Sequence, residues 1–136
     1  MTPIMQTRYG PRGNCLAACI ASLIDRPLEE VDFSCADHPD DWDDVAREKL
    51  APHGLTFAHI RANMREHLLT FGPVLYIAHG FTNRPGMLQH AVIMQGRELI
   101  HDPHPGGSGI LYVREASFIT PLNFARPTPC RSMMRT

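Results

Sequence analysis

Residues 13–24 read GNCLAACIASLI, and this stretch predicts the helix around which the rest of the chain is organised. Its larger apolar side chains recur at helical spacing and would form a buried face; they are Leu16, Ile20, Leu23 and Ile24. Asn14 is a favourable N-cap, because its side-chain oxygen can accept a hydrogen bond from a backbone N–H of the first turn. Cys15 then takes the first helical position, where free N–H groups and the helix dipole stabilise an anion. This position favours a thiolate nucleophile at Cys15.

The composition is that of one packed domain, and we expect residues 1–136 to fold as a single unit. The net charge of -1 argues against a nucleic-acid-binding surface, which needs a basic excess. A membrane span is not expected, because the sequence has no run of about 18 apolar residues. The N-terminus lacks the features of a secretory signal. We therefore expect a cytoplasmic protein whose four cysteines are thiols, and the sequence leaves its oligomeric state open.

Helical patterns come first in the chain and strand patterns follow. A second amphipathic helix is predicted over residues 41–50, with acidic residues in its first turn and basic residues in its last. The predicted strands are 55–59, 74–78, 90–94, 98–102 and 110–113, with a further short strand at 118–119. Residues 61–71 are ambiguous, with one helical turn or more as an open alternative, and the last ten residues are expected to form a tail. This order predicts an α+β domain, with an N-terminal helical half packed on a C-terminal antiparallel sheet.

The hairpin around residues 95–97 offers a base and a partner for the thiol. With a three-residue loop, Met94 pairs with Glu98, and counting outward places His90 opposite Asp102 on the same face. With a two-residue loop the register slips by one, and Asp102 becomes a diagonal or opposite-face neighbour of His90. A thiolate nucleophile needs a base within reach and a group that orients the base.

At this point the sequence resembles the papain-like cysteine peptidases. The residues that carry the resemblance are Asn14-Cys15 opening a helix, Cys19 four residues on, His90-Ala91-Val92 and then Asp102-Pro103. The pattern is most similar to the bacteriocin-leader-processing peptidase domains of export transporters and related small bacterial or phage proteins. The resemblance implies a papain-like fold with Cys15 as nucleophile, His90 as base and Asp102 as the group that orients His90.

The resemblance also implies an oxyanion hole formed by an upstream glutamine and the Cys15 backbone N–H. Gln6 is the only glutamine before Cys15, so it takes this role. Eight residues separate Gln6 from Cys15, more than is usual in the family, so we expect residues 7–13 to bulge. The family glycine after the nucleophile is Leu16 here, so substrate preference does not carry over.

Arg84 lies in the loop that leads into His90, and such loops often shape a substrate cleft. We name Arg84 as a substrate-binding residue that would receive a carboxylate. The alternative is an ordinary solvated arginine.

The remaining cysteines and histidines have simpler interpretations. Cys19 is expected to be packing, while Cys35 and Cys130 are expected to be incidental loop residues. A zinc site would use Cys15, Cys19, Cys35 and His38, but the first two share an apolar helix, unlike most structural zinc pairs. His101 and His104 would line the rim of the cleft or be solvated. No partner pattern is evident for His38, His53, His59, His67 and His79.

We therefore hypothesise a cysteine-dependent hydrolase that needs no cofactor and no metal. It would act on a peptide or another amide-containing substrate through a thioester, as a peptidase, isopeptidase or amidase, and acyl transfer is a further option. One alternative is a peptide-binding module that keeps the fold without turnover. The other is a zinc-stabilised interaction domain.

Overall fold

The computed structural model describes residues 1–60, 73–84 and 89–125. Its α-helices are α1 (Cys15–Ile24), α2 (Trp42–Leu50) and the short α3 (Leu122–Ala125). Single 3-10 turns are η1 (Gly10–Arg12), η2 (Leu28–Glu30), η3 (Cys35–Asp37) and η4 (Ala51–His53). The strands are β1 (Leu55–Ile60), β2 (Leu75–Phe81), β3 (Gln89–Gln95), β4 (Glu98–His101) and β5 (Glu115–Pro121). None of the helices in these ranges is long and apolar enough to cross a membrane.

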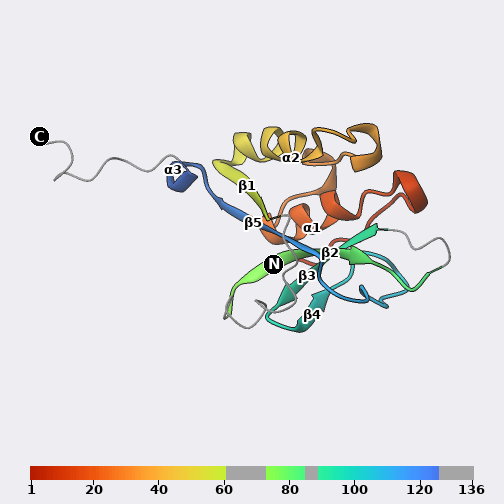
Figure 1. Cartoon of the computed structure of the whole chain (residues 1–136). Coiled ribbons are helices and arrows are strands. Elements are labelled where there is room, and N and C mark those ends of the chain that lie inside the picture. Colours follow the sequence, from red (N-terminus) through yellow and green to blue (C-terminus); the bar gives the residue numbers. More distant parts are fainter. Residues whose placement is uncertain (61–72, 85–88, 126–136) are drawn as a thin grey trace, which may run out of the picture.

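The strands form one sheet in the order β1-β5-β2-β3-β4, and every neighbouring pair is antiparallel. The last strand in sequence, β5, lies between β1 and β2 near the middle of the sheet. Helices lead the chain and strands follow, which confirms the predicted α+β class (Figure 1).

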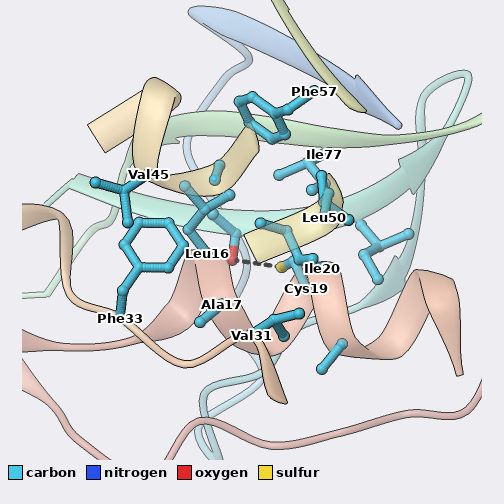
Figure 2. Packing of buried hydrophobic residues seen from close by; sticks show 14 residues of the cluster. Leu16, Ala17, Cys19, Ile20, Val31, Phe33, Val45, Leu50, Phe57 and Ile77 are labelled. Atoms are coloured by element: carbon cyan, nitrogen blue, oxygen red, sulfur yellow. Dashed lines mark hydrogen bonds between the residues drawn. The ribbon is translucent and has the colours of Figure 1, made fainter. Parts of the chain in front are cut away.

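Helices α1 and α2 supply the main core together with one face of the sheet. Leu16 and Ile20 of α1 and Leu50 of α2 pack with Phe57 of β1 and Ile77 of β2 (Figure 2). Helix α1 ends where predicted, because Asp25 adopts a left-handed conformation (φ 56°) ahead of Pro27. This packing fixes the N-terminus of α1, and with it Cys15, against the sheet.

The prediction of a side-chain N-cap at Asn14 was wrong. Its side chain makes no cap hydrogen bond to α1 and is buried in the preceding loop. Asn14 Oδ1 accepts hydrogen bonds from the backbone N–H groups of Thr7 and Arg8, each at 3.0 Å. Asn14 Nδ2 donates to Thr7 Oγ1 and to Asp32 Oδ1, also at 3.0 Å. Asn14 therefore folds the loop that precedes the helix instead of capping the helix.

Residues 110–113 are not the strand that was predicted. The segment crosses the second face of the sheet as irregular chain, where Val113 packs with Tyr76 and Val92. It is held to β2 by hydrogen bonds from the N–H groups of Leu111 and Arg114. A Cβ at Gly80 would collide with the carbonyl oxygen of Tyr112, so the close approach depends on that glycine. The real strand is β5, of which the sequence indicated only residues 118–119.

Of the two hairpin loops that the sequence left open, the structure has the two-residue loop. Gln95 pairs with Glu98 and Met94 with Leu99, so the turn has two residues, with Gly96 at φ 59°. A bulge then shifts the register, and Ile93 pairs with His101. Without the bulge, every residue after Leu99 would face the other side of the sheet. With it, Asp102 lies on the His90 face, as a diagonal neighbour.

Some expectations fall on parts of the chain outside the described residues. They concern residues 61–71, His67, the C-terminal tail and Cys130. Among the described elements, the predicted helix over 41–50 and strand over 55–59 are confirmed as α2 and β1. The strand predicted over 74–78 is present as β2, which runs further, to Phe81.

Candidate active site

Cys15 is the first residue of α1 and is partly buried. Its backbone N–H is in the first turn of the helix and has no acceptor within the helix. Cys19 lies one turn deeper and is fully buried, and its Sγ donates to the carbonyl oxygen of Ala91 at 3.5 Å. Burial raises the pKa of Cys19 well above its ordinary range, so this second thiol is a packing group.

His90 and Asp102 are in direct contact. His90 Nε2 lies 2.6 Å from Asp102 Oδ1, and the two side chains are 2% and 4% exposed. Because the carboxylate accepts from Nε2, the other ring nitrogen, Nδ1, is left to exchange a proton with another group. The contact predicted from the hairpin is present, although it arises from the bulge and not from direct cross-strand pairing.

Asp102 is held in place by two loop residues that the sequence pattern did not indicate. The N–H of His104 donates to Oδ1 at 2.9 Å, and the N–H of Gly109 donates to Oδ2 at 2.8 Å. Burial opposes ionisation, but the hydrogen bonds from His90, His104 and Gly109 outweigh it and lower the pKa of Asp102 to about 2. The residue is therefore a fixed anion at neutral pH.

His90 lies between this anion and the thiol. Burial disfavours its protonated form, but the hydrogen bond to Asp102 and the interaction with Cys15 outweigh burial and raise the pKa of His90 to about 9. The imidazolium form is thus favoured at neutral pH. A protonated imidazole beside the sulfur stabilises a thiolate.

Gln6 reaches the same place from the N-terminal segment and is 5% exposed. Its backbone N–H donates to Pro103 O at 3.0 Å, so the segment runs beside the residue that follows Asp102. The side-chain Nε2 donates to Arg8 O at 2.9 Å. The expected bulge is present as the turn η1, and the Asn14 network holds the backbone of Thr7 and Arg8.

Gln6, Cys15, Arg84 and His90 line one small pocket of about 70 Å³. Two of these lining residues carry a buried side-chain atom, Gln6 Oε1 and Arg84 Nε, that has no hydrogen-bond partner within the described parts of the chain. The five residues singled out from the sequence therefore converge, since Asp102 contacts His90 directly behind this pocket. Two larger hollows, of about 340 and 360 Å³, are not lined by Cys15 or His90.

Other predicted positions turn out differently. His101 is not at the rim, because it is 9% exposed and its Nε2 contacts Ile4 O at 2.8 Å, which ties the N-terminal segment to β4. Cys35 is more than an incidental loop residue, since it packs against the core and burial raises its pKa to about 12. Within the described ranges, no three side chains of His, Cys, Asp or Glu gather as a metal site.

His59 and His79 have partners that the sequence did not indicate. His59 Nδ1 lies 2.7 Å from Ser117 Oγ, and His59 Nε2 lies 3.0 Å from Glu115 Oε2. His79 Nε2 lies 2.6 Å from the same serine oxygen. These side chains meet because β5 pairs with both β1 and β2. The sequence did not reveal this pairing, so the network could not be predicted.

Comparison with known proteins gives one structural relative. No protein-family model and no curated protein matches the sequence. The fold is similar to the crystal structure of a double glycine motif protease from an AMS/PCAT transporter, solved in complex with the leader peptide. The TM-score is 0.50 at 15% identity, over 89% of this chain and 92% of the protease chain. At this identity the likeness concerns the fold, and the chain has the papain-like architecture of that protease.

Proposed function

We propose that this chain is a cysteine peptidase or a related cysteine-dependent amide hydrolase. The observation that carries the proposal is the Asp102–His90 contact at 2.6 Å, on a pocket that Cys15 lines. The resemblance of residues 14–19, 90–92 and 102–103 to papain-like peptidases supports it, as does the shared fold.

In the proposed reaction, the Cys15 thiol gives its proton to His90 and the thiolate attacks the substrate carbonyl carbon. The carbonyl electrons move to the oxygen, and the oxyanion accepts hydrogen bonds from the Cys15 N–H and from Gln6 Nε2. As the C–N bond breaks, His90 returns the proton to the departing amine, leaving a thioester. His90 then takes a proton from the attacking water, and collapse of the second oxyanion releases the acid and restores the thiol.

Asp102 keeps its negative charge through this cycle. It holds His90 with the proton on Nε2 and stabilises the imidazolium. The same groups suit peptide, isopeptide and side-chain amide bonds, and a thioester opened by an amine in place of water gives acyl transfer.

Selective alkylation tests the proposal. Wild type, Cys15→Ala and His90→Ala are treated with iodoacetamide at neutral pH, and labelled cysteines are mapped by mass spectrometry. We expect Cys15 to react at least 10-fold faster than Cys35 and Cys130, and this excess to disappear in His90→Ala. A Cys15 that reacts no faster than the other thiols contradicts the proposal. Peptide binding at an unreactive Cys15 would instead support a non-catalytic module.

A further inference from the structure

Arg84 lies on the wall of the Cys15 pocket, at the point where β2 has ended. Thr82 is fully buried, and its Oγ1 accepts a hydrogen bond from the Arg84 backbone N–H at 3.3 Å. This turn anchors the backbone of Arg84. The side chain lines the pocket of about 70 Å³ together with Cys15 and His90. A group held by Arg84 therefore lies close to the bond that Cys15 would attack.

Among the residues that the structure describes, no carboxylate neutralises the charge of Arg84. Two other arginines near the pocket, Arg8 and Arg12, pair with Asp32 at 2.8 Å and with Asp37 at 3.4 Å. For Arg84, no carboxylate of the described residues lies within ion-pair distance. Asp102 is an acidic residue of the same site, and its oxygens are occupied by His90, His104 and Gly109.

Arg84 also carries a buried donor with no acceptor. Its Nε and Gln6 Oε1 are the buried side-chain atoms without a partner among the residues that the structure describes, and both atoms belong to residues that line this pocket. Leaving a buried polar group unpaired is unfavourable. An unpaired donor and an unpaired acceptor on two residues that line one small pocket match a ligand that brings both an anionic oxygen and an N–H.

We infer that Arg84 forms an anion subsite and that the substrate carries a carboxylate within one or two residues of the scissile bond. This inference rests on the proposed function. Guanidinium and carboxylate form strong charge-assisted hydrogen bonds, often in pairs. Gln6 Oε1 accepts an N–H of the same substrate segment. The carboxylate comes either from a free C-terminus or from an acidic side chain beside the scissile bond.

Two alkylating probes of nearly equal size test the subsite without a known substrate. Iodoacetate places a carboxylate next to its reacting carbon, and iodoacetamide places a neutral amide there. The measured quantity is the ratio of their second-order rates at Cys15 in wild type, Arg84→Gln, Arg84→Lys and Arg97→Gln. Arg97 is exposed and does not line this pocket, so its variant controls for loss of one positive charge.

We expect Arg84→Gln to lower the iodoacetate-to-iodoacetamide ratio about 10-fold, as loss of a charge-assisted bond predicts. The ratio of Arg84→Lys should lie between those of wild type and Arg84→Gln. Arg97→Gln should leave the ratio within about twofold of wild type. An equal ratio in wild type and both Arg84 variants overturns the inference. An unreactive Cys15 in wild type instead overturns the proposed function, so the two failures are distinct. If Arg84→Gln does not fold, the Arg84→Lys ratio decides.

Competition against iodoacetamide identifies the source of the carboxylate. The competitors are N-acetyl-Ala-Ala with a free C-terminus, its C-terminal amide, and N-acetyl-Ala-Asp as an amide. Stronger protection by the first indicates a terminal carboxylate, and stronger protection by the third indicates an acidic side chain. Equal protection by the neutral amide, or no protection by either acidic peptide, counts against the subsite.

Discussion

Asp102 determines the charge state of His90, and replacing it by Asn gives a direct test. The Asp102→Asn variant keeps the shape but loses the negative charge that holds the pKa of His90 near 9. The His90 pKa should fall, which an NMR titration of the ring measures. Cleavage of an amide needs the imidazolium as proton donor, so wild-type activity should decline as pH rises through about 9.

In Asp102→Asn this alkaline limb should move to lower pH, and the maximal rate should drop by at least about 10²-fold; the same change in a Ser-His-Asp triad costs about 10⁴-fold. Glu98→Gln is the matched control, because Glu98 is an exposed carboxylate on the same hairpin. An unchanged His90 pKa in Asp102→Asn would contradict the role of Asp102.

Gln6 should affect only reactions that pass through an oxyanion. Acylation of Cys15 by 4-nitrophenyl acetate forms one, whereas alkylation by iodoacetamide does not. Gln6→Ala should therefore slow acylation by about 10²-fold and leave the alkylation rate within a few-fold of wild type. Both rates are measured on the same preparation. A parallel loss of both reactions would indicate that Gln6 only shapes the site.

At the scale of elements, the β3–β4 hairpin shows why the sequence could predict the His90–Asp102 contact but could not decide the register. The apolar and polar pattern of residues 90–102 fits two registers, and neither includes a bulge. The bulge shifts the register after Leu99, so Asp102 regains the His90 face even though the turn has two residues. A bulge leaves little trace in the hydropathy pattern. The pattern therefore predicted the His90–Asp102 contact but not the bulge that produces it.

The loops around the site were less predictable than the helix and strands. Helix α1 follows from its apolar periodicity, and its packing positions Cys15. The roles of Asn14, His101 and Gly109 depend on loop conformations that have no periodic signal. Asn14 next to a helix start fits the N-cap pattern. Only the folded positions of residues 7–8 and of Asp32 show that the Asn14 side chain bonds to the preceding loop and not to the helix.

The segment 110–113 depends on Gly80, and this makes a second element-scale prediction. A methyl group at Gly80 would collide with the Tyr112 carbonyl oxygen and press on Ile110. Gly80→Ala should therefore lower the free energy of unfolding by about 1–3 kcal/mol, the usual effect of overpacking. Urea denaturation measures it. Ala58→Val, at an exposed position of β1, is the control and should stay within about 0.5 kcal/mol of wild type. Equal stability of both variants would mean that the segment moves freely away from β2.

At the scale of the whole molecule, a polar network ties α2 to three strands. Ser117 of β5 contacts His59 of β1 and His79 of β2, and the Trp42 ring of α2 lies 4.7 Å from the His59 ring. Ser117 is fully buried and the His59 side chain is 2% exposed. Burial, with repulsion from His59 as a smaller cause, lowers the pKa of His79 to about 3. His79 is thus neutral in the folded protein across the physiological range.

The network should make the fold sensitive to acid. An unfolded chain protonates His79 near its ordinary pKa of about 6.5, whereas the folded chain resists protonation until about pH 3. Between these values the unfolded state binds more protons, so the free energy of unfolding falls as pH falls. Protonation of this histidine alone should lower the free energy of unfolding by about 2 kcal/mol between pH 7.5 and pH 5.

His79→Gln keeps a hydrogen-bonding group without a titrating ring, so the decrease in its unfolding free energy over this interval should be smaller by that amount. His53→Gln, outside the network, should keep the wild-type slope. Denaturant unfolding at both pH values measures these differences, and equal slopes in wild type and His79→Gln would show that His79 accepts a proton without unfolding.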